Sequence, residues 1–236
     1  MRIEKYLNTT PEEVGSRRHD IWLGISLGNK YFTAEHMERY ITWALAHTKE
    51  RVLIVIGDAI QAVNIEVLDS RTPHHALKRA RKLGDEQHAV ISAVIAALPP
   101  AQQELVRLVR FEEVTGAQPY RHNLQVVEEA YEKNPAFREA IRTIIRNGRK
   151  DRTEKIAHLT EEKLDRLADY ILDELPLYAN GAQANGAATV HTLTLYPALT
   201  MLDELCTGLW QGTCFPEVAA QLDLSNRTAI LDAYVE

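Results

Sequence analysis

The sequence predicts an α/β fold in which parallel strands are covered by helices. Residues 20–26 and 52–56 are short apolar runs, and the second, Val-Leu-Ile-Val-Ile, is typical of a parallel strand buried on both faces. Residues 34–49 carry apolar side chains at helical spacing, including Met37 and Ile41. Strand, helix and strand in this order form a βαβ unit, whose crossover is right-handed in nearly all proteins.

The middle of the chain continues this alternation of helices and strands. The expected elements are a helix over 60–69, a helix over 73–98 that ends at Pro99-Pro100, a strand over 105–111, and helical residues 118–148 with a break near Asn134-Pro135. A charged connection over 149–155 follows. No internal repeat or linker divides the chain.

The last third begins with a well-marked helix over residues 160–175. Thr160 is a suitable N-cap, and Glu161 and Glu162 match the positive end of the helix dipole. Pro176 is expected to end this helix. A polar loop over 180–188 and a strand over 189–196 follow, and Pro197 suits the first turn of a further helix.

Composition indicates one soluble domain over residues 1–236. No apolar run approaches the length of a membrane span, and the N-terminus lacks the apolar segment of a secretory signal. We therefore expect a cytoplasmic protein with no membrane partner. Cys206 and Cys214 are spaced neither as a zinc knuckle nor as a redox pair, which leaves two buried thiols.

The formal charge of −6 argues against broad nucleic-acid binding, DNA included. Two segments are nevertheless strongly basic. Residues 71–82 carry five fixed positive charges, and Arg138, Arg142, Arg146 and Arg149 recur at helical spacing. Either segment could contact phosphates locally or form a solvated helix face.

The segment Gly24-Ile25-Ser26-Leu27-Gly28 sets a serine between two glycines at the end of the first predicted strand. Missing side chains on both sides allow a sharp turn and let a substrate carbonyl approach the hydroxyl, which is how a nucleophile is presented. The alternative is that the glycines serve only the turn from strand to helix.

A tyrosine and an acid lie one helical turn apart at Tyr170 and Glu174, so they project from the same face of the predicted helix. Together they could hold an amine, or they could be a partly buried tyrosine beside a surface acid. Tyr196 ends a predicted strand, as Ser26 does, and open α/β sheets bind ligands at that edge. If the two strands are neighbours, these four side chains can share one pocket.

The motifs Gly24-Ile25-Ser26-Leu27-Gly28-Asn29, Tyr170-x-x-x-Glu174 and Tyr196-Pro197 resemble, in order and rough spacing, those of the cyclodipeptide synthases. The resemblance implies a Rossmann-like fold, with a central, mostly parallel sheet and helices on both faces, similar to the catalytic domain of class I aminoacyl-tRNA synthetases. It implies two aminoacyl-tRNAs as substrates and no ATP, metal or other cofactor. Consistently, the sequence contains no phosphate-binding loop motif.

The same resemblance implies roles for individual residues. Ser26 is expected to take the first aminoacyl group as an ester, Tyr170 and Glu174 to hold the aminoacyl amine, and Tyr196 to handle protons during cyclisation. Tyr196-Pro197 places the chain nearer the branch of the family that carries Tyr-Pro. Asn29 is a feature of the other branch, so its role here departs from the pattern.

Substrate-binding positions are also implied by the resemblance. The first side-chain pocket is expected to be lined by Trp22, Gly24, Ile54, Ile56, Phe111, Leu177 and Thr194. The second is expected around Ile144, Asn147, Gly148 and Asp151, where nearby arginines would suit an acidic or polar amino acid. Lys78, Arg79, Arg81 and Lys82 are the candidates for binding tRNA.

Two other functions compete with this interpretation. An α/β serine hydrolase would use Ser26 with His191 as its base, oriented by Asp165, Asp169 or Asp173, but its nucleophile would follow several strands and not the first. A non-catalytic tRNA-binding module would keep the basic clusters and be indifferent to Ser26→Ala.

Overall fold

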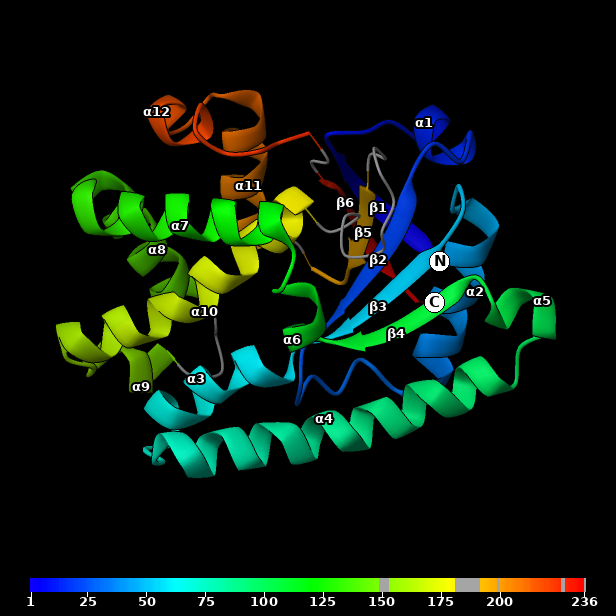
Figure 1. Ribbon diagram of the computed structural model, residues 1–236, viewed down its shortest axis with the longest axis horizontal. Helices are drawn as coiled ribbons and strands as arrows, with labels where there is room; N and C mark the ends of the chain where they lie inside the picture. Colours follow the sequence, from blue (N-terminus) through cyan, green and yellow to red (C-terminus); the bar gives the residue numbers. More distant parts are fainter. Residues whose placement is uncertain (149–152, 181–191, 199, 226–227, 236) are drawn as a thin grey trace.

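The computed structural model describes residues 1–148, 153–180, 192–198, 200–225 and 228–235. One six-stranded sheet runs through the molecule in the order β1-β6-β5-β2-β3-β4 (Figure 1). All neighbouring strands are parallel except β1, which is antiparallel to β6. The strands are β1 (Arg2–Leu7), β2 (Asp20–Ile25), β3 (Val52–Ile56), β4 (Val106–Arg110), β5 (Thr192–Tyr196) and β6 (Thr228–Tyr234).

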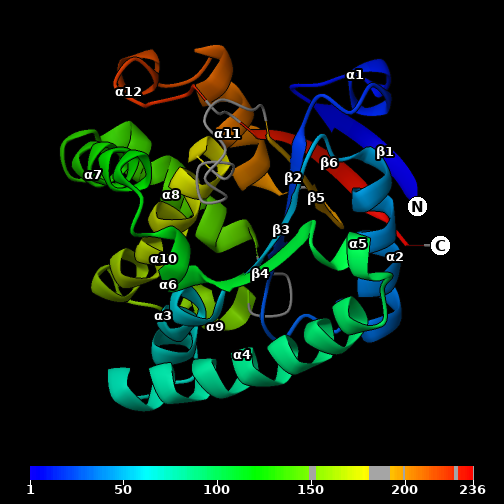
Figure 2. The same ribbon diagram turned by 45° about the vertical axis from the view of Figure 1, so that its right-hand side comes forward.

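Helices cover both faces of this sheet (Figures 1 and 2). Helix α2 and the C-terminal end of α4 pack on one face, while α3, α7, α8, α10 and α11 form a thick layer on the other. The helices are α1 (Pro11–Gly15), α2 (Ala34–His47), α3 (Asp58–Leu68), α4 (Pro73–Ala96), α5 (Pro100–Gln103), α6 (Phe111–Val114), α7 (Gln118–Lys133), α8 (Pro135–Gly148), α9 (Thr153–Ala157), α10 (Glu161–Asn180), α11 (Met201–Gln211) and α12 (Pro216–Ala219).

The pleat of the central strands divides the apolar residues between two cores. Leu23 and Ile54 are paired across β2 and β3 and face α2. Trp22 and Leu53, one residue earlier on each strand, face the layer that contains α10. Because side chains alternate along a strand, each position is fixed to one of the two cores. The core that contains Trp22 and Leu53 is the one next to the candidate site.

Helix α10 is longer than the sequence predicts. Pro176 lies inside the helix, which continues to Asn180, so the expectation that the proline ends it is wrong. A proline in a helix interior loses one hydrogen bond and crowds the carbonyl four residues earlier. The following residues Leu177, Tyr178 and Ala179 are all buried in the core, and this packing outweighs the local penalty.

Pro197 does not begin a helix, contrary to the sequence-based expectation. Ala198 has a φ of 68°, which is incompatible with a right-handed helix, and α11 starts only at Met201. The start is fixed by a capping box in which the Asp203 carboxylate accepts hydrogen bonds from the N–H and hydroxyl of Thr200 at 2.6 and 2.9 Å.

Other predicted bounds differ by a few residues. Strand β4 ends at Arg110, because the Glu113 carboxylate accepts the Arg110 N–H and starts α6 at Phe111. Residues 181–191, which include the predicted loop and the first part of the predicted strand over 189–196, lie outside the described residues. Of the two cysteines, Cys206 is buried and Cys214 is half-buried, and both are free thiols. In the described ranges no helix is long and apolar enough to cross a membrane.

Candidate active site

Ser26 directly follows β2, at the carboxyl end of the strand in the middle of the sheet. Chain connections run from β2 outward to β3 and β4 on one side and return to β5 and β6 on the other. The end of β2 is therefore a topological switch point, where open α/β sheets form a crevice. Gly28 adopts a φ of 76°, which favours glycine and turns the chain so that the serine is presented there.

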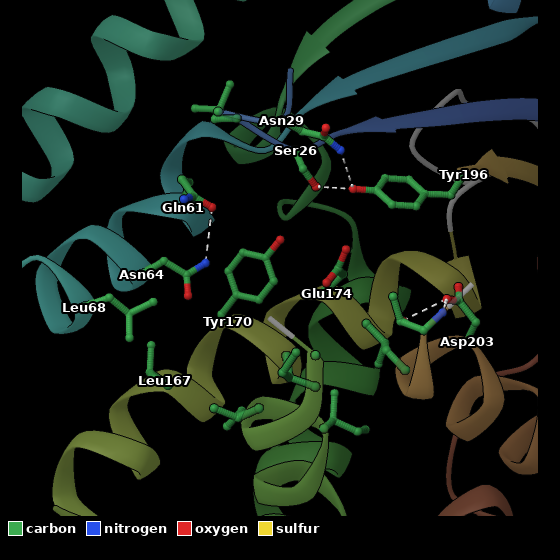
Figure 3. Close-up of a pocket in the computed structure, with 18 of the residues that line it drawn as sticks. Ser26, Asn29, Gln61, Asn64, Leu68, Leu167, Tyr170, Glu174, Tyr196 and Asp203 are labelled. Carbon is green, nitrogen blue, oxygen red and sulfur yellow. Dashed lines mark hydrogen bonds between the residues drawn. The ribbon is translucent and has the colours of Figure 1, made fainter. Parts of the chain in front are cut away.

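Tyr196 lies at the corresponding end of β5, which pairs in parallel with β2. Its phenol donates a hydrogen bond to Ser26 Oγ at 3.0 Å, and the Asn29 amide donates to the same phenol oxygen at 3.4 Å (Figure 3). The Asn29 carbonyl oxygen in turn accepts the Tyr31 N–H at 3.0 Å, which holds the amide in this orientation. Serine, tyrosine and asparagine thus form one hydrogen-bonded chain.

Tyr170 and Glu174 project from α10 into the space that Ser26 also reaches (Figure 3). Burial, with a smaller contribution from the nearby Asp203 carboxylate, raises the pKa of Glu174 from 4.5 to about 8. Burial also raises the pKa of Tyr196, so its phenol stays protonated at neutral pH. The structure therefore brings together all four side chains that the motifs single out.

Two further residues of the site, Tyr178 and Asp203, were not predicted. Tyr178 continues the Tyr170–Glu174 face by one more helical turn, a spacing visible in the sequence once the helix is known to pass Pro176. Asp203 is 2% exposed, and burial raises its pKa. No sequence signal marks Asp203, because its position depends on where α11 begins.

Beside Ser26 lies a small cavity of about 40 Å³, between the sheet and α10. It gathers five of the residues predicted for the first pocket: Trp22, Gly24, Phe111, Leu177 and Thr194. A Cβ at Gly24 would meet the Trp22 ring at 3.1 Å, so a side chain there would press on the pocket wall.

Ile54 and Ile56 do not line this cavity, which corrects the predicted first pocket. Ile54 packs in the core under α2, on the opposite face of the sheet, and Ile56 is two residues further along the same strand. The residues from this strand that do reach the cavity are Val55 and Gly57. Val55 and Gly57 are each one residue away from the predicted positions, and successive side chains along a strand point to opposite faces of the sheet.

A larger cavity of about 400 Å³ opens from Ser26 toward α3, α8 and α10. Ile144 and Gly148 line it as predicted for a second pocket, whereas Asn147 is exposed and bonds instead to the Thr143 carbonyl. Asp151 lies outside the described residues. Gln61 and Asn64 of α3 also line this cavity and were not predicted.

The two basic clusters differ in how their charges are used. On α4, Lys78, Arg79, Arg81 and Lys82 are all exposed, with Arg81 paired to Glu112 and Lys82 to Glu86.

In the second cluster, Arg142 pairs with Glu161 and Asp165, and Arg146 with Glu139. Arg138 donates to two backbone carbonyls, and Arg149 lies outside the described residues. Helix α4 is therefore the better candidate surface for phosphates.

The parts of a serine hydrolase do not assemble around Ser26. Asp165 on α10 is engaged by Arg142 and by the Tyr131 phenol, and Asp169 is paired with Arg166. Asp173 does not line either cavity that Ser26 reaches. The proposed base, His191, lies outside the described residues.

A mostly parallel sheet with a serine at its switch point, faced by a tyrosine and an acid from a long helix, suits acyl transfer on a fold like that of the class I aminoacyl-tRNA synthetases. The chain belongs to the cyclodipeptide synthase family, whose model matches residues 5–213. No curated protein sequence matches it.

Solved structures show the same fold. The chain is similar to a cyclodipeptide synthase from Staphylococcus haemolyticus, with 16% identity, a TM-score of 0.75 and 98% of each chain covered. It is also similar to the cyclodipeptide synthase from Candidatus Glomeribacter gigasporarum bound to Phe-tRNAPhe, with 16% identity, a TM-score of 0.59, and 92% of this chain and 88% of that chain covered. Tyrosyl-tRNA synthetase from Archaeoglobus fulgidus shares the fold at 10% identity and a TM-score of 0.56, covering 97% of this chain and 60% of the synthetase.

Proposed function

We propose that this protein joins the aminoacyl groups of two aminoacyl-tRNAs into a cyclic dipeptide through a covalent ester on Ser26. The observation that supports it is the shared space around Ser26, in which Tyr196 bonds the hydroxyl and Tyr170 and Glu174 face it from α10. A nucleophile, a proton donor and a proton acceptor are then all within one site.

In the first step, Ser26 Oγ attacks the carbonyl carbon of the first aminoacyl ester. The new ester to Ser26 forms, the bond to the tRNA ribose oxygen breaks, and that oxygen receives a proton. Tyr196 supports this transfer because its phenol lies 3.0 Å from Oγ: it takes up the proton that Oγ loses as it passes its own proton to the leaving oxygen, so the phenol ends unchanged. One ester replaces another, so the step needs no nucleotide to drive it.

In the second step, the amine of the Ser26-bound aminoacyl group attacks the ester carbonyl of the second aminoacyl-tRNA. An amide forms, the second tRNA leaves, and Ser26 carries a dipeptidyl ester. The amine of the second residue then attacks the Ser26 ester, closing the six-membered ring and freeing the hydroxyl. Holding the groups side by side makes both steps effectively intramolecular, worth roughly 7–11 kcal/mol of the barrier in favourable geometry.

Glu174 is the group proposed to take up the proton that each attacking amine loses and to give it to the leaving oxygen, which is the ribose oxygen of the second tRNA in the first case and Ser26 Oγ in ring closure. The ionised carboxylate is the form that accepts this proton; with a pKa of about 8 it is the minor form at pH 7, and its basicity is close to that of an α-amino group, whose pKa is about 7.7–8.0. Tyr170 lies one turn away on the same face and helps to hold the amine.

The small cavity beside Ser26 is proposed to hold the first side chain. Its volume of about 40 Å³ and its walls of Trp22, Val55 and Phe111 favour a small apolar amino acid. The exposed cations of α4 are proposed to contact tRNA phosphates, as counter-charges that position the acceptor end.

Tyr196-Pro197 supports membership in the branch of the family that carries Tyr-Pro. In this chain Asn29 supports the phenol of Tyr196 by a hydrogen bond, which gives the asparagine a positioning role. The continuous sheet from β1 to β4 supports a single synthase domain over residues 1–236. We expect the proposed activity in the cytoplasm, because aminoacyl-tRNAs are its proposed substrates.

Expression in a bacterium, with mass spectrometry of the medium, tests the proposal. The wild-type protein is expected to release a diketopiperazine that Ser26→Ala abolishes. Ser225→Ala, at an exposed serine, is the matched control and should leave the product unchanged. Undiminished product from Ser26→Ala would overturn the covalent mechanism.

A further inference from the structure

Two carboxamide side chains project from α3 into the large cavity. Gln61 and Asn64 are three residues apart, with Leu68 one turn further on, so all three lie on one face of the helix. Gln61 is 7% and Asn64 6% exposed. Figure 3 shows both side chains directed toward Tyr170, with Leu68 and Leu167 beside Asn64.

The two amides bond to each other and leave part of their capacity unused. Asn64 donates to the Gln61 carbonyl oxygen at 3.2 Å, and within the described part of the chain this is the one hydrogen bond of either side chain. The Gln61 NH2 group and the Asn64 carbonyl oxygen are therefore both unused, and exchanging both amide orientations again leaves one NH2 group and one carbonyl oxygen. Neither remaining atom is sealed from the cavity.

Water that enters the cavity can satisfy these groups until a ligand displaces it, so a bound ligand must supply the hydrogen bonds in place of the water. A ligand that leaves either group unpaired binds less tightly than one that completes the pair. The neighbouring wall of the cavity is aliphatic, with Leu68, Ile156 and Leu167. The arrangement fits a ligand with an apolar body and one polar end.

We propose that Gln61 and Asn64 read the side chain of the second amino acid and select an uncharged hydroxyl or carboxamide side chain. This rests on the proposed function. A hydroxyl can accept from one amide and donate to the other, and a carboxamide has the same complementary pair.

An acidic side chain fits this end of the cavity less well. Among the described residues that line the cavity, Lys30 is the one cation, and it is exposed. Arg146, which could have served an acidic side chain, is paired with Glu139 on the outer surface. A carboxylate buried beside the two amides would lack a cationic partner there.

The test uses the purified protein with bacterial tRNA charged with all twenty amino acids, and measures every diketopiperazine by mass spectrometry. The wild-type product is expected to contain serine, threonine, tyrosine, asparagine or glutamine. Gln61→Met and Asn64→Leu remove the polar pair at similar volume. Each is expected to lower the ratio of the polar residue to its apolar analogue about 10- to 100-fold.

Three outcomes would overturn the inference. One is a wild-type product made only of apolar or charged residues, which needs no variant to be seen. Another is an unchanged product ratio in Gln61→Met and Asn64→Leu. The third is an equal loss of all products in both variants with an unaltered melting temperature. That result would mean that the amides contact the end of the tRNA that all substrates share and not the amino-acid side chain. Gln102→Leu, at an exposed amide on α5, is the matched control.

In each case, formation of any diketopiperazine by the wild type keeps the proposed function standing, and its absence would count against that function instead.

Discussion

Replacing Glu174 by glutamine should stabilise the protein at alkaline pH and leave its stability nearly unchanged in mild acid. The pKa of this carboxyl is about 8 in the folded protein against 4.5 in the unfolded chain, so the folded state holds the proton more tightly. Wild-type stability therefore falls as pH rises from about 4.5 to about 8, while the unfolded chain alone loses the proton. Glutamine resembles the protonated acid and does not undergo this loss.

The size of the effect follows from the two pKa values. At about 1.4 kcal/mol for each pKa unit, the difference corresponds to at most about 5 kcal/mol above pH 8. Because Glu174 lines a cavity that water can enter, we expect roughly 2–4 kcal/mol.

Urea unfolding at pH 4.5 and pH 8.5 measures this difference directly, provided that the slope of the transition is unchanged. Glu204→Gln, at an exposed acid on α11, is the control; it keeps Glu174, so its stability should follow the wild-type pH profile. Parallel stability profiles for the wild type and Glu174→Gln would refute the raised pKa. Glu174→Gln should also lose most product formation, since a carboxamide cannot accept the amine proton.

Three further variants, one of them a double substitution, test the phenol, the small cavity and the basic helix α4. Tyr196→Phe removes the phenol bonded to Ser26 Oγ and should slow single-turnover acylation roughly 10- to 100-fold, with folding unchanged by circular dichroism; an unaltered rate would exclude its role as proton donor. Phe111→Ala opens the small cavity and should shift the first residue of the product toward larger side chains; the same products as wild type would separate that cavity from selection. Lys78→Glu combined with Arg79→Glu should raise KM for aminoacyl-tRNA and flatten its salt dependence, whereas Lys49→Glu should not; equal salt slopes would place the tRNA elsewhere.

The central part of the fold could be predicted because its signals are local. The βαβ unit depends on apolar runs and on helical spacing, and the glycines around Ser26 mark the turn in the sequence itself. The approach of Tyr196 to Ser26 also follows, once β5 and β2 are neighbours.

The errors arose where distant residues decide the local structure. Pro176 remains helical because the residues after it are buried by the rest of the fold, and α11 starts late because Asp203 caps Thr200. Strand β1 pairs antiparallel with β6, which joins the two ends of the chain. No periodic pattern in the sequence predicts such a contact.

Pocket residues show the same limit at finer scale. Val55 reaches the small cavity and Ile54 does not, although both are buried β-branched residues in one apolar run. A strand buried on both faces gives no alternation of polar and apolar residues to show which side is which. Gln61 and Asn64 read as ordinary polar positions of a helix until α10 is placed against them.

The most direct test of the covalent mechanism is the mass of the intact protein after brief exposure to tRNA charged with a single amino acid that the enzyme uses. The mechanism predicts an increase equal to one aminoacyl residue, located on the peptide that contains Ser26, released by hydroxylamine and absent from Ser26→Ala. Steady production of the cyclic dipeptide with no acylated protein at any quench time would contradict it.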